Sequence, residues 1–180
     1  MAKSDRKTID KVFILLGVAA TAVLLVVGGL SWYAYRFADN SVKSELGAQQ
    51  VYFPAKGSAA LDPTEFPDLQ KYAGQLVDNG PKAKAYADGF IGRHLEKIAD
   101  GKTYAQISTL AQADPTNAAL QQEKQTLFQG ETLRGLLLGD GYAYWTFGQI
   151  AMYAAIAAFA GSAIMVVLVL SGLKHLARLK

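Results

Sequence analysis

Two long apolar segments lie near the ends of the chain. No charged residue lies between Lys11 and Arg36, and none lies between Asp140 and Lys174. A helix needs about 20 predominantly apolar residues to cross the hydrocarbon core of a bilayer, and both segments are longer. A helix buried in a water-soluble protein would keep a polar stripe at helical spacing, which neither segment has. The pattern therefore predicts transmembrane helices over residues 12–35 and 142–173, the second including a short interfacial lead-in.

Aromatic residues gather where each apolar segment meets the middle of the chain. Tyrosine and tryptophan concentrate at the membrane–water interface, where an apolar ring and a polar tip are both accommodated. We therefore expect an interfacial belt, although core packing of one or two of these rings in the intervening domain is an alternative. The set comprises Trp32, Tyr33, Tyr35, Tyr142, Tyr144, Trp145 and Phe147.

The short ends of the chain set the expected orientation. Residues 1–11 carry four basic and two acidic side chains, and residues 174–180 carry three basic and no acidic ones. Short basic flanks remain cytoplasmic, so we expect two cytoplasmic tails, two antiparallel helices and an extracytoplasmic segment over residues 36–141. The first apolar segment is longer than the core of a signal peptide and lacks a small-residue cleavage site after it, which favours an uncleaved anchor.

Charge and cysteine content exclude some classes of function. Residues 38–141 hold 13 acidic and 10 basic residues, so the net charge of +3 comes from the flanks of the apolar segments. A nucleic-acid surface would need basic residues clustered on one face, and we expect no nucleic-acid partner. The chain has no cysteine, which rules out disulfides and thiolate metal sites.

Turn and capping signals divide the middle of the chain into short helices. We expect one helix over residues 62–80, ending at Asn79–Gly80, and a third over residues 102–113 with Thr103 as N-cap. The second, over residues 81–101, has one apolar face. That face consists of Ala87, Phe90, Ile91, His94, Leu95 and Ile98.

A longer helix is expected to begin with Asp114 as its N-cap and Pro115 at the first helical position. It would continue into the second apolar segment, with a bend or interruption at Gly139–Gly141. It would bury Leu120, Leu127 and Phe128 against the second helix. Only residues 49–57 look extended, and Pro54 limits them to an edge strand or an irregular segment. The predicted fold class is an all-α membrane protein, with two antiparallel transmembrane helices and a small extracytoplasmic helical domain between them. Small residues four apart, such as Ala151 and Ala155, permit close helix contact.

Candidate chemical sites are few. His94 has no acidic residue at i±3 or i±4 to share its helix face, so partial burial in the core is the favoured interpretation over a metal or catalytic role. Glu131 and Arg134 fit a surface ion pair at i, i+3 spacing, but Arg134 is also a candidate contact for lipid phosphates or a partner subunit. Neither apolar segment contains aspartate, glutamate, lysine or arginine, which disfavours a transport pathway. We expect no catalytic, cofactor or metal site, and no enzyme.

Three stretches resemble a family of small actinobacterial membrane proteins with two membrane helices and a helical outer loop. The resemblance covers most of residues 45–165 and implies that fold, but it implies no reaction and no functional residue. The stretches are VYFPAKGSAAL, YAGQLVDNGPKAKAYADGFIGRHLEKIADGKTY and TLFQGETLRGLLLGDGYAYWTFGQIAMYAAIAAF.

The expected function follows from these features. We expect a non-enzymatic, multi-pass protein of the plasma membrane that acts as an accessory or scaffolding subunit of a larger cell-envelope complex. Its partners would be the lipid bilayer and other membrane subunits. The alternative is an extracytoplasmic module that binds a lipid or an envelope metabolite. An enzyme that uses His94 ranks last.

Overall fold

The computed structural model describes residues 3–178, and this part of the chain is helical with no β-strand. Residues 1–2 and 179–180, which belong to the predicted tails 1–11 and 174–180, lie outside the described residues. The chain forms two compact units. One unit combines the chain up to Phe37 with the chain from Gly148 onward, and the other comprises Ala38–Phe147, close to the expected domain 36–141.

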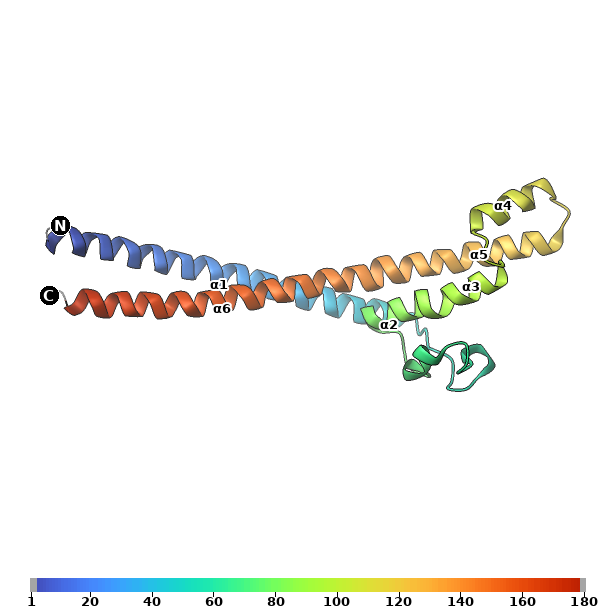
Figure 1. Ribbon diagram of the computed structural model, residues 1–180, viewed down its shortest axis with the longest axis horizontal. Coiled ribbons are helices and arrows are strands. Elements are labelled where there is room, and N and C mark those ends of the chain that lie inside the picture. Colours follow the sequence, from blue (N-terminus) through green and yellow to red (C-terminus); the bar gives the residue numbers. More distant parts are fainter. Residues whose placement is uncertain (1–2, 179–180) are drawn as a thin grey trace. The chain divides into compact units, whose positions relative to one another are not determined.

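Two helices are long and apolar enough to cross a membrane. α1 covers Lys3–Ala48 and α6 covers Tyr144–Arg178 (Figure 1). By length and composition, the candidate spans lie within the helical stretches Arg6–Ala48 and Ala118–Arg178. The all-helical fold with two such helices is therefore confirmed.

Small residues line the contact between α1 and α6 in the first unit. Gly17 and Gly28 are buried on α1. A Cβ added at Gly17 would lie 2.7 Å from Val169 Cγ2, and one added at Gly28 would lie 2.7 Å from the Phe159 ring. On α6 the buried positions follow at intervals of seven, three and four residues, at Gly148, Ala155, Ala158 and Ser162. Glycine, alanine and serine thus let the two helices approach closely.

The second unit contains short helical elements and one long helix. Two 3₁₀-helices, η1 (Ala59–Leu61) and η2 (Pro67–Tyr72), follow the end of α1. A second helical stretch is formed by α2 (Gly80–Lys84), the π-helix η3 (Ala85–Gly92) and α3 (Arg93–Ile98). α4 (Tyr104–Ala113) then packs on α5 (Ala118–Leu136), which continues through the π-helix η4 (Leu137–Ala143) into α6.

The helix predicted over residues 62–80 is wrong. Only the 3₁₀-helix η2 forms there, and the segment after it is extended, with an isolated antiparallel bridge between Tyr52 and Leu76. The extended conformation expected near residues 49–57 is consistent with this bridge. Asn79 does not end a helix but begins α2, because its side chain accepts a hydrogen bond from the backbone N–H of Lys82 at 3.0 Å. Asparagine serves both as an N-cap and as a helix stop, so sequence alone did not distinguish the two.

The second helix forms as expected, but its buried face differs. Every fourth residue is buried: Ala83, Ala87, Ile91, Leu95 and Ala99. On a regular α-helix each residue turns the chain by about 100°, so a spacing of four would drift around the axis. The π-helix η3 holds more residues per turn and so keeps this stripe on one side. Ile98, which we expected to be buried, is exposed as a result.

The capping predictions in the third helix and after it have opposite outcomes. Thr103 caps α4 as expected, and a capping box pairs it with Gln106, whose side chain accepts a hydrogen bond from the Thr103 N–H at 2.8 Å. Asp114, expected as the N-cap of the next helix, is instead the C-cap of α4. The cap of α5 is Asn117, which accepts from Leu120 N at 3.2 Å. Pro115 therefore lies in the connection and not at the first helical position.

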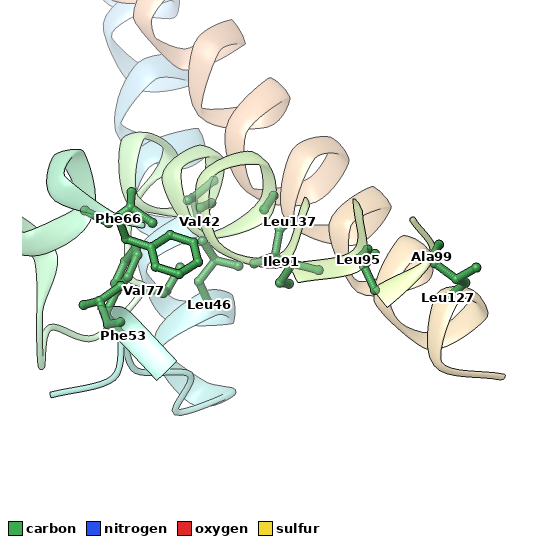
Figure 2. Packing of buried hydrophobic residues seen from close by; sticks show 14 of the residues in the cluster. Val42, Leu46, Phe53, Phe66, Val77, Ile91, Leu95, Ala99, Leu127 and Leu137 are labelled. Carbon is green, nitrogen blue, oxygen red and sulfur yellow. The ribbon is translucent and has the colours of Figure 1, made fainter. Parts of the chain in front are cut away.

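The predicted long helix is continuous from Ala118 to Arg178. At Gly139–Gly141 it widens into the π-helix η4 and does not break. Leu127 is buried in the hydrophobic core of the second unit, which includes Leu46 from α1 and Leu95 from α3 (Figure 2). Phe128 was expected in this core but is exposed, with its ring 5.9 Å from that of Tyr104.

Candidate functional site

Arg134 lies at the centre of a charged cluster between α5 and η3. Its Nε donates a hydrogen bond to the carbonyl oxygen of Ala87 at 3.1 Å. Its guanidinium also pairs with Asp88 at 3.3 Å and with Glu131 at 2.9 Å. We call Lys84, Asp88, Glu131 and Arg134 the Arg134 cluster, since Lys84 pairs with Asp88 at 2.6 Å. The cluster joins two helical stretches that are more than 40 residues apart in sequence.

Local helix geometry places each member of this cluster. Glu131 and Arg134 are three residues apart on α5, and Lys84 and Asp88 are four apart across the junction of α2 and η3, so each pair shares one helix face. Gly92 lies next to this contact, and an added Cβ would be 3.4 Å from both Ala87 O and Arg134 Nε, at the edge of ordinary van der Waals contact.

The cluster shifts the protonation equilibria of two of its members, Asp88 and Lys84. The hydrogen bond from Lys84 is the largest cause that lowers the pKa of Asp88 below its ordinary value of 3.8, and the bond from Arg134 adds to it. The same bond to Asp88 raises the pKa of Lys84 above 10.5. Both groups are therefore held in their charged forms near neutral pH.

A cleft of about 590 Å³ opens beside the cluster, lined by residues of η3, α3, α5 and the start of α4. Leu95 and Leu127 supply apolar lining, while Glu96, Lys102 and Tyr104 add polar groups. Both signs of charge are present, so the lining does not select strongly for an anion or for a cation. The size suits a small polar molecule.

The candidate pair Glu131 and Arg134 thus forms within the described structure. The i, i+3 ion pair that we expected is present at 2.9 Å. The bonds to Ala87 and Asp88 come from a distant part of the chain, and spacing alone gave no sign of them. These interactions of Arg134 lie within the second unit, and a contact with lipid or a partner subunit stays a prediction.

The aromatic residues of the expected belt have different surroundings. Trp145 is half-buried in the second unit and packs on Gly80, where an added Cβ would lie 2.5 Å from the indole Cγ. Tyr144 also packs against the core, and Tyr142 stacks on Trp145 with ring centroids 6.2 Å apart. Lys84 lies over the Tyr142 ring at 5.1 Å. Core packing therefore accounts for Tyr144 and Trp145.

The remaining members of that set are more accessible. Trp32 and Tyr33 on α1 and Phe147 on α6 are exposed, whereas Tyr35 is half-buried. Trp32 makes an edge contact with Tyr35, with ring centroids 5.3 Å apart. These exposed rings match what an interfacial belt requires.

His94 lies among aromatic rings. It is half-buried, stacks on Phe66 with ring centroids 5.1 Å apart, and lies 4.5 Å from the Phe90 centroid. Its Nδ1 is 2.9 Å from the carbonyl oxygen of Phe90, one helical turn earlier. Within residues 3–178, no three His, Asp or Glu side chains are grouped so as to hold a metal ion.

A second set of ion pairs joins α3 to η2 and to the turn before it, and this set was not predicted. Arg93 forms a bidentate pair with Asp68, with both nitrogen–oxygen distances 2.8 Å, and this hydrogen bonding lowers the pKa of Asp68 below 3.8. Lys97 pairs with Glu65 at 2.8 Å. These partners are 25 and 32 residues apart, so no local spacing rule could identify them.

Comparison with known proteins adds no relative. No protein-family model matches the chain, and the searches of curated proteins and of solved structures find no match.

Proposed function

We propose that this protein is a membrane-anchored helical scaffold, an accessory subunit of a cell-envelope complex. The observation that carries the proposal is the exposed apolar surface of the first unit. In the most apolar window of each long helix, only 11% and 17% of the residues are buried. The two helices cover little of each other, so most of their apolar surface needs a non-aqueous environment.

The size of this surface favours a bilayer. Removing one Val, Leu, Ile or Phe side chain from water contributes about 1.5–3 kcal/mol. Exposed side chains of this kind recur on every side of the first unit that does not face the other helix, including Phe13, Leu16, Val26, Ile164 and Val167. A bilayer, or a set of partner helices within it, would bury them. Ile14, early in α1, lies near Gly172, late in α6, whereas Gly28, further along α1, lies near the earlier residue Phe159. This reversed order supports an antiparallel pair of transmembrane helices.

The charged groups of the second unit support a structural role for it. Asp88 pairs with both Lys84 and Arg134, and Arg93 pairs with Asp68. Catalytic groups usually have perturbed pKa values that match their task near neutral pH, whereas the shifts of Asp88 and Asp68 stabilise the ionised form. We propose that this unit is an extracytoplasmic domain that presents a stable surface to partner subunits.

The proposal also includes the orientation of the chain in the membrane and the family to which it is related. The basic residues in the segments 1–11 and 174–180 support cytoplasmic tails. The three stretches quoted above support kinship with the actinobacterial two-helix membrane family.

The proposal is tested by gentle detergent extraction followed by native mass measurement. We expect the full-length chain to remain in the membrane pellet after alkaline carbonate treatment and to migrate, after mild extraction, in a complex heavier than a monomer. Loss from the pellet would contradict the membrane anchor. A lone monomer in every mild detergent would contradict the accessory-subunit role while leaving the anchor intact.

The cleft beside the Arg134 cluster favours a second candidate function. At about 590 Å³, with Glu96, Lys102 and Tyr104 in its lining, it would accept a small polar envelope metabolite. In that case a small molecule should co-purify in stoichiometric amount and be displaced by Glu96→Gln together with Lys102→Gln. A protein that carries no small molecule, and whose thermal stability does not respond to envelope extracts, would contradict this candidate.

A further inference from the structure

An arginine and three aromatic residues form one exposed patch on α1. Trp32, Tyr33, Arg36 and Phe37, which we call the Arg36 patch, are spaced so that Trp32 and Arg36, and also Tyr33 and Phe37, are four residues apart and share a helix face. The three rings are 44%, 69% and 54% exposed, and Arg36 is exposed as well. The Tyr33 and Phe37 rings stack with centroids 6.4 Å apart.

The guanidinium of Arg36 is free to bind. Among residues 3–178, it has neither an ion pair nor a hydrogen bond from its side chain. Arg134, by contrast, is occupied by Ala87, Asp88 and Glu131. A guanidinium offers five N–H donors in a planar fork that matches a phosphate bidentately, and at Arg36 this fork has no protein acceptor.

The position of the Arg36 patch along α1 indicates which part of a bilayer it would contact. Arg36 is the first charged residue after the uncharged segment that begins beyond Lys11. At 1.5 Å per residue, that segment is about as long as the hydrocarbon core is thick. If the helix crosses a bilayer, Arg36 and its rings lie at the level of the lipid headgroups, where tryptophan and tyrosine are favoured.

We propose that the Arg36 patch binds the phosphodiester of an anionic phospholipid. The guanidinium donates to the phosphate oxygens, while the exposed Trp32, Tyr33 and Phe37 rings pack against the glycerol and the first acyl carbons. An anionic headgroup without an ammonium group, such as that of phosphatidylglycerol, is preferred because it presents no positive charge that would repel Arg36. This inference rests on the proposed membrane anchor and adds a specific lipid contact to it.

The test uses full-length protein, native mass spectrometry and titration with phosphatidylglycerol or phosphatidylcholine. We expect the unsubstituted protein to retain phosphatidylglycerol in preference to phosphatidylcholine, and Arg36→Gln to weaken phosphatidylglycerol retention about tenfold. Arg36→Lys should restore part of the retention, because it keeps the charge but loses the bidentate fork. Lys43→Gln is the matched control, since it removes one exposed positive charge from the same helix at a position outside the Arg36 patch.

Equal phosphatidylglycerol retention by the unsubstituted protein and Arg36→Gln would overturn the inference. So would an equal loss in Lys43→Gln, because that result would indicate a general charge effect. If Arg36→Gln instead converted a dimer to a monomer, the patch would be a contact between two copies, and the lipid assignment would be wrong. Carbonate extraction of each variant distinguishes these results from failure of the anchor itself, which would release the unsubstituted protein as well.

Discussion

At the scale of single residues, Arg134 connects more of the second unit than any local pattern suggested. Its side chain is 27% exposed and bonds to a backbone carbonyl and two carboxylates. A hydrogen bond to a charged group contributes about 1.5–3 kcal/mol when it is shielded from water, and removing one partner leaves the others unsatisfied. Arg134 therefore acts as a structural tie between α5 and η3.

Replacing Arg134 with glutamine should lower the free energy of unfolding of the second unit by about 1–3 kcal/mol. Glu131→Gln is the control, and it should cost less than about 1 kcal/mol because Glu131 contributes only an exposed ion pair. Urea unfolding in detergent can be followed by the fluorescence of Trp145 in a Trp32→Phe background. Similar costs for the two variants would show that the bonds to Ala87 and Asp88 contribute little.

Stability should also depend on pH through Asp88. Its pKa is lowered in the folded state, so its contribution is fully present above the unfolded value of 3.8 and is lost as pH falls through the folded pKa. We expect the urea midpoint to decline as the pH falls below about 4, and to decline less in Asp88→Asn. A decline of the same size in this variant would assign the acid sensitivity to other carboxylates, such as Asp68.

Local side-chain signals were predictable at this scale, and distant partners were not. Thr103 was identified as a cap because its hydrogen bond stays within four residues. The Glu131–Arg134 pair was predictable for the same reason. The ion pairs of Asp88 and Asp68 were not predictable, because their arginine partners lie on other elements. Sequence spacing carries no information about contacts between elements.

At the scale of elements, glycines determine how closely the helices of the second unit approach. A Cβ on Gly130 of α5 would lie 2.5 Å from Leu95 Cδ2, and one on Gly141 of η4 would lie 2.9 Å from Ala83 Cβ. The glycines at 139–141 were expected to bend the helix. The helix is not interrupted there, Gly141 permits a close contact with α2, and the segment forms the π-helix η4.

Gly130→Ala and Gly135→Ala should have opposite effects. Both sites lie on α5, but an added Cβ at Gly135 would meet no atom within 4 Å. Alanine at position 135 should stabilise the second unit by up to about 1 kcal/mol through helix propensity. At position 130, overpacking against Leu95 costs about 1–3 kcal/mol and should outweigh that gain. The same urea titration measures both, and stabilisation by both substitutions would show that Leu95 moves aside freely.

The number and order of long helices were predictable because apolar length and capping are local properties. The π-helices were not, because they depend on contacts between elements. A period of 3.6 residues placed Ile98 on the buried face, whereas the structure buries Leu95 and Ala99 at a spacing of four. The prediction of a helix over residues 62–80 was wrong for a related reason. The apolar residues of this segment are buried by loop packing and not as a stripe along a helix.

At the scale of the whole molecule, topology is the property that the chain specifies most simply. Basic residues flank both apolar segments at the ends of the chain, and the segment between them has 13 acidic and 10 basic residues. The positive-inside rule then predicts that both ends lie on the cytoplasmic side.

A reporter fused after Lys180 should behave as cytoplasmic, and a protease site inserted near Ser58 should be cleaved only from outside the cell. Ser58 lies in the connection before η1, next to the turn at Gly57, so an insertion there should leave the helices intact. Cleavage near Ser58 only after the membrane is permeabilised would reverse the predicted orientation without affecting the two-span arrangement.

The two π-helices have a consequence for inheritance. A π-turn holds one more residue than the α-turn that it replaces, so gain or loss of a single codon is the smallest genetic step between the two states. Ala85–Gly92 and Leu137–Ala143 are in contact. Each π-helix determines which of its own buried residues face the other segment. A deletion in one segment would rotate the helix beyond it by about 100° and misalign those residues. Among natural relatives, the extra codon should therefore be kept in both segments or lost from both.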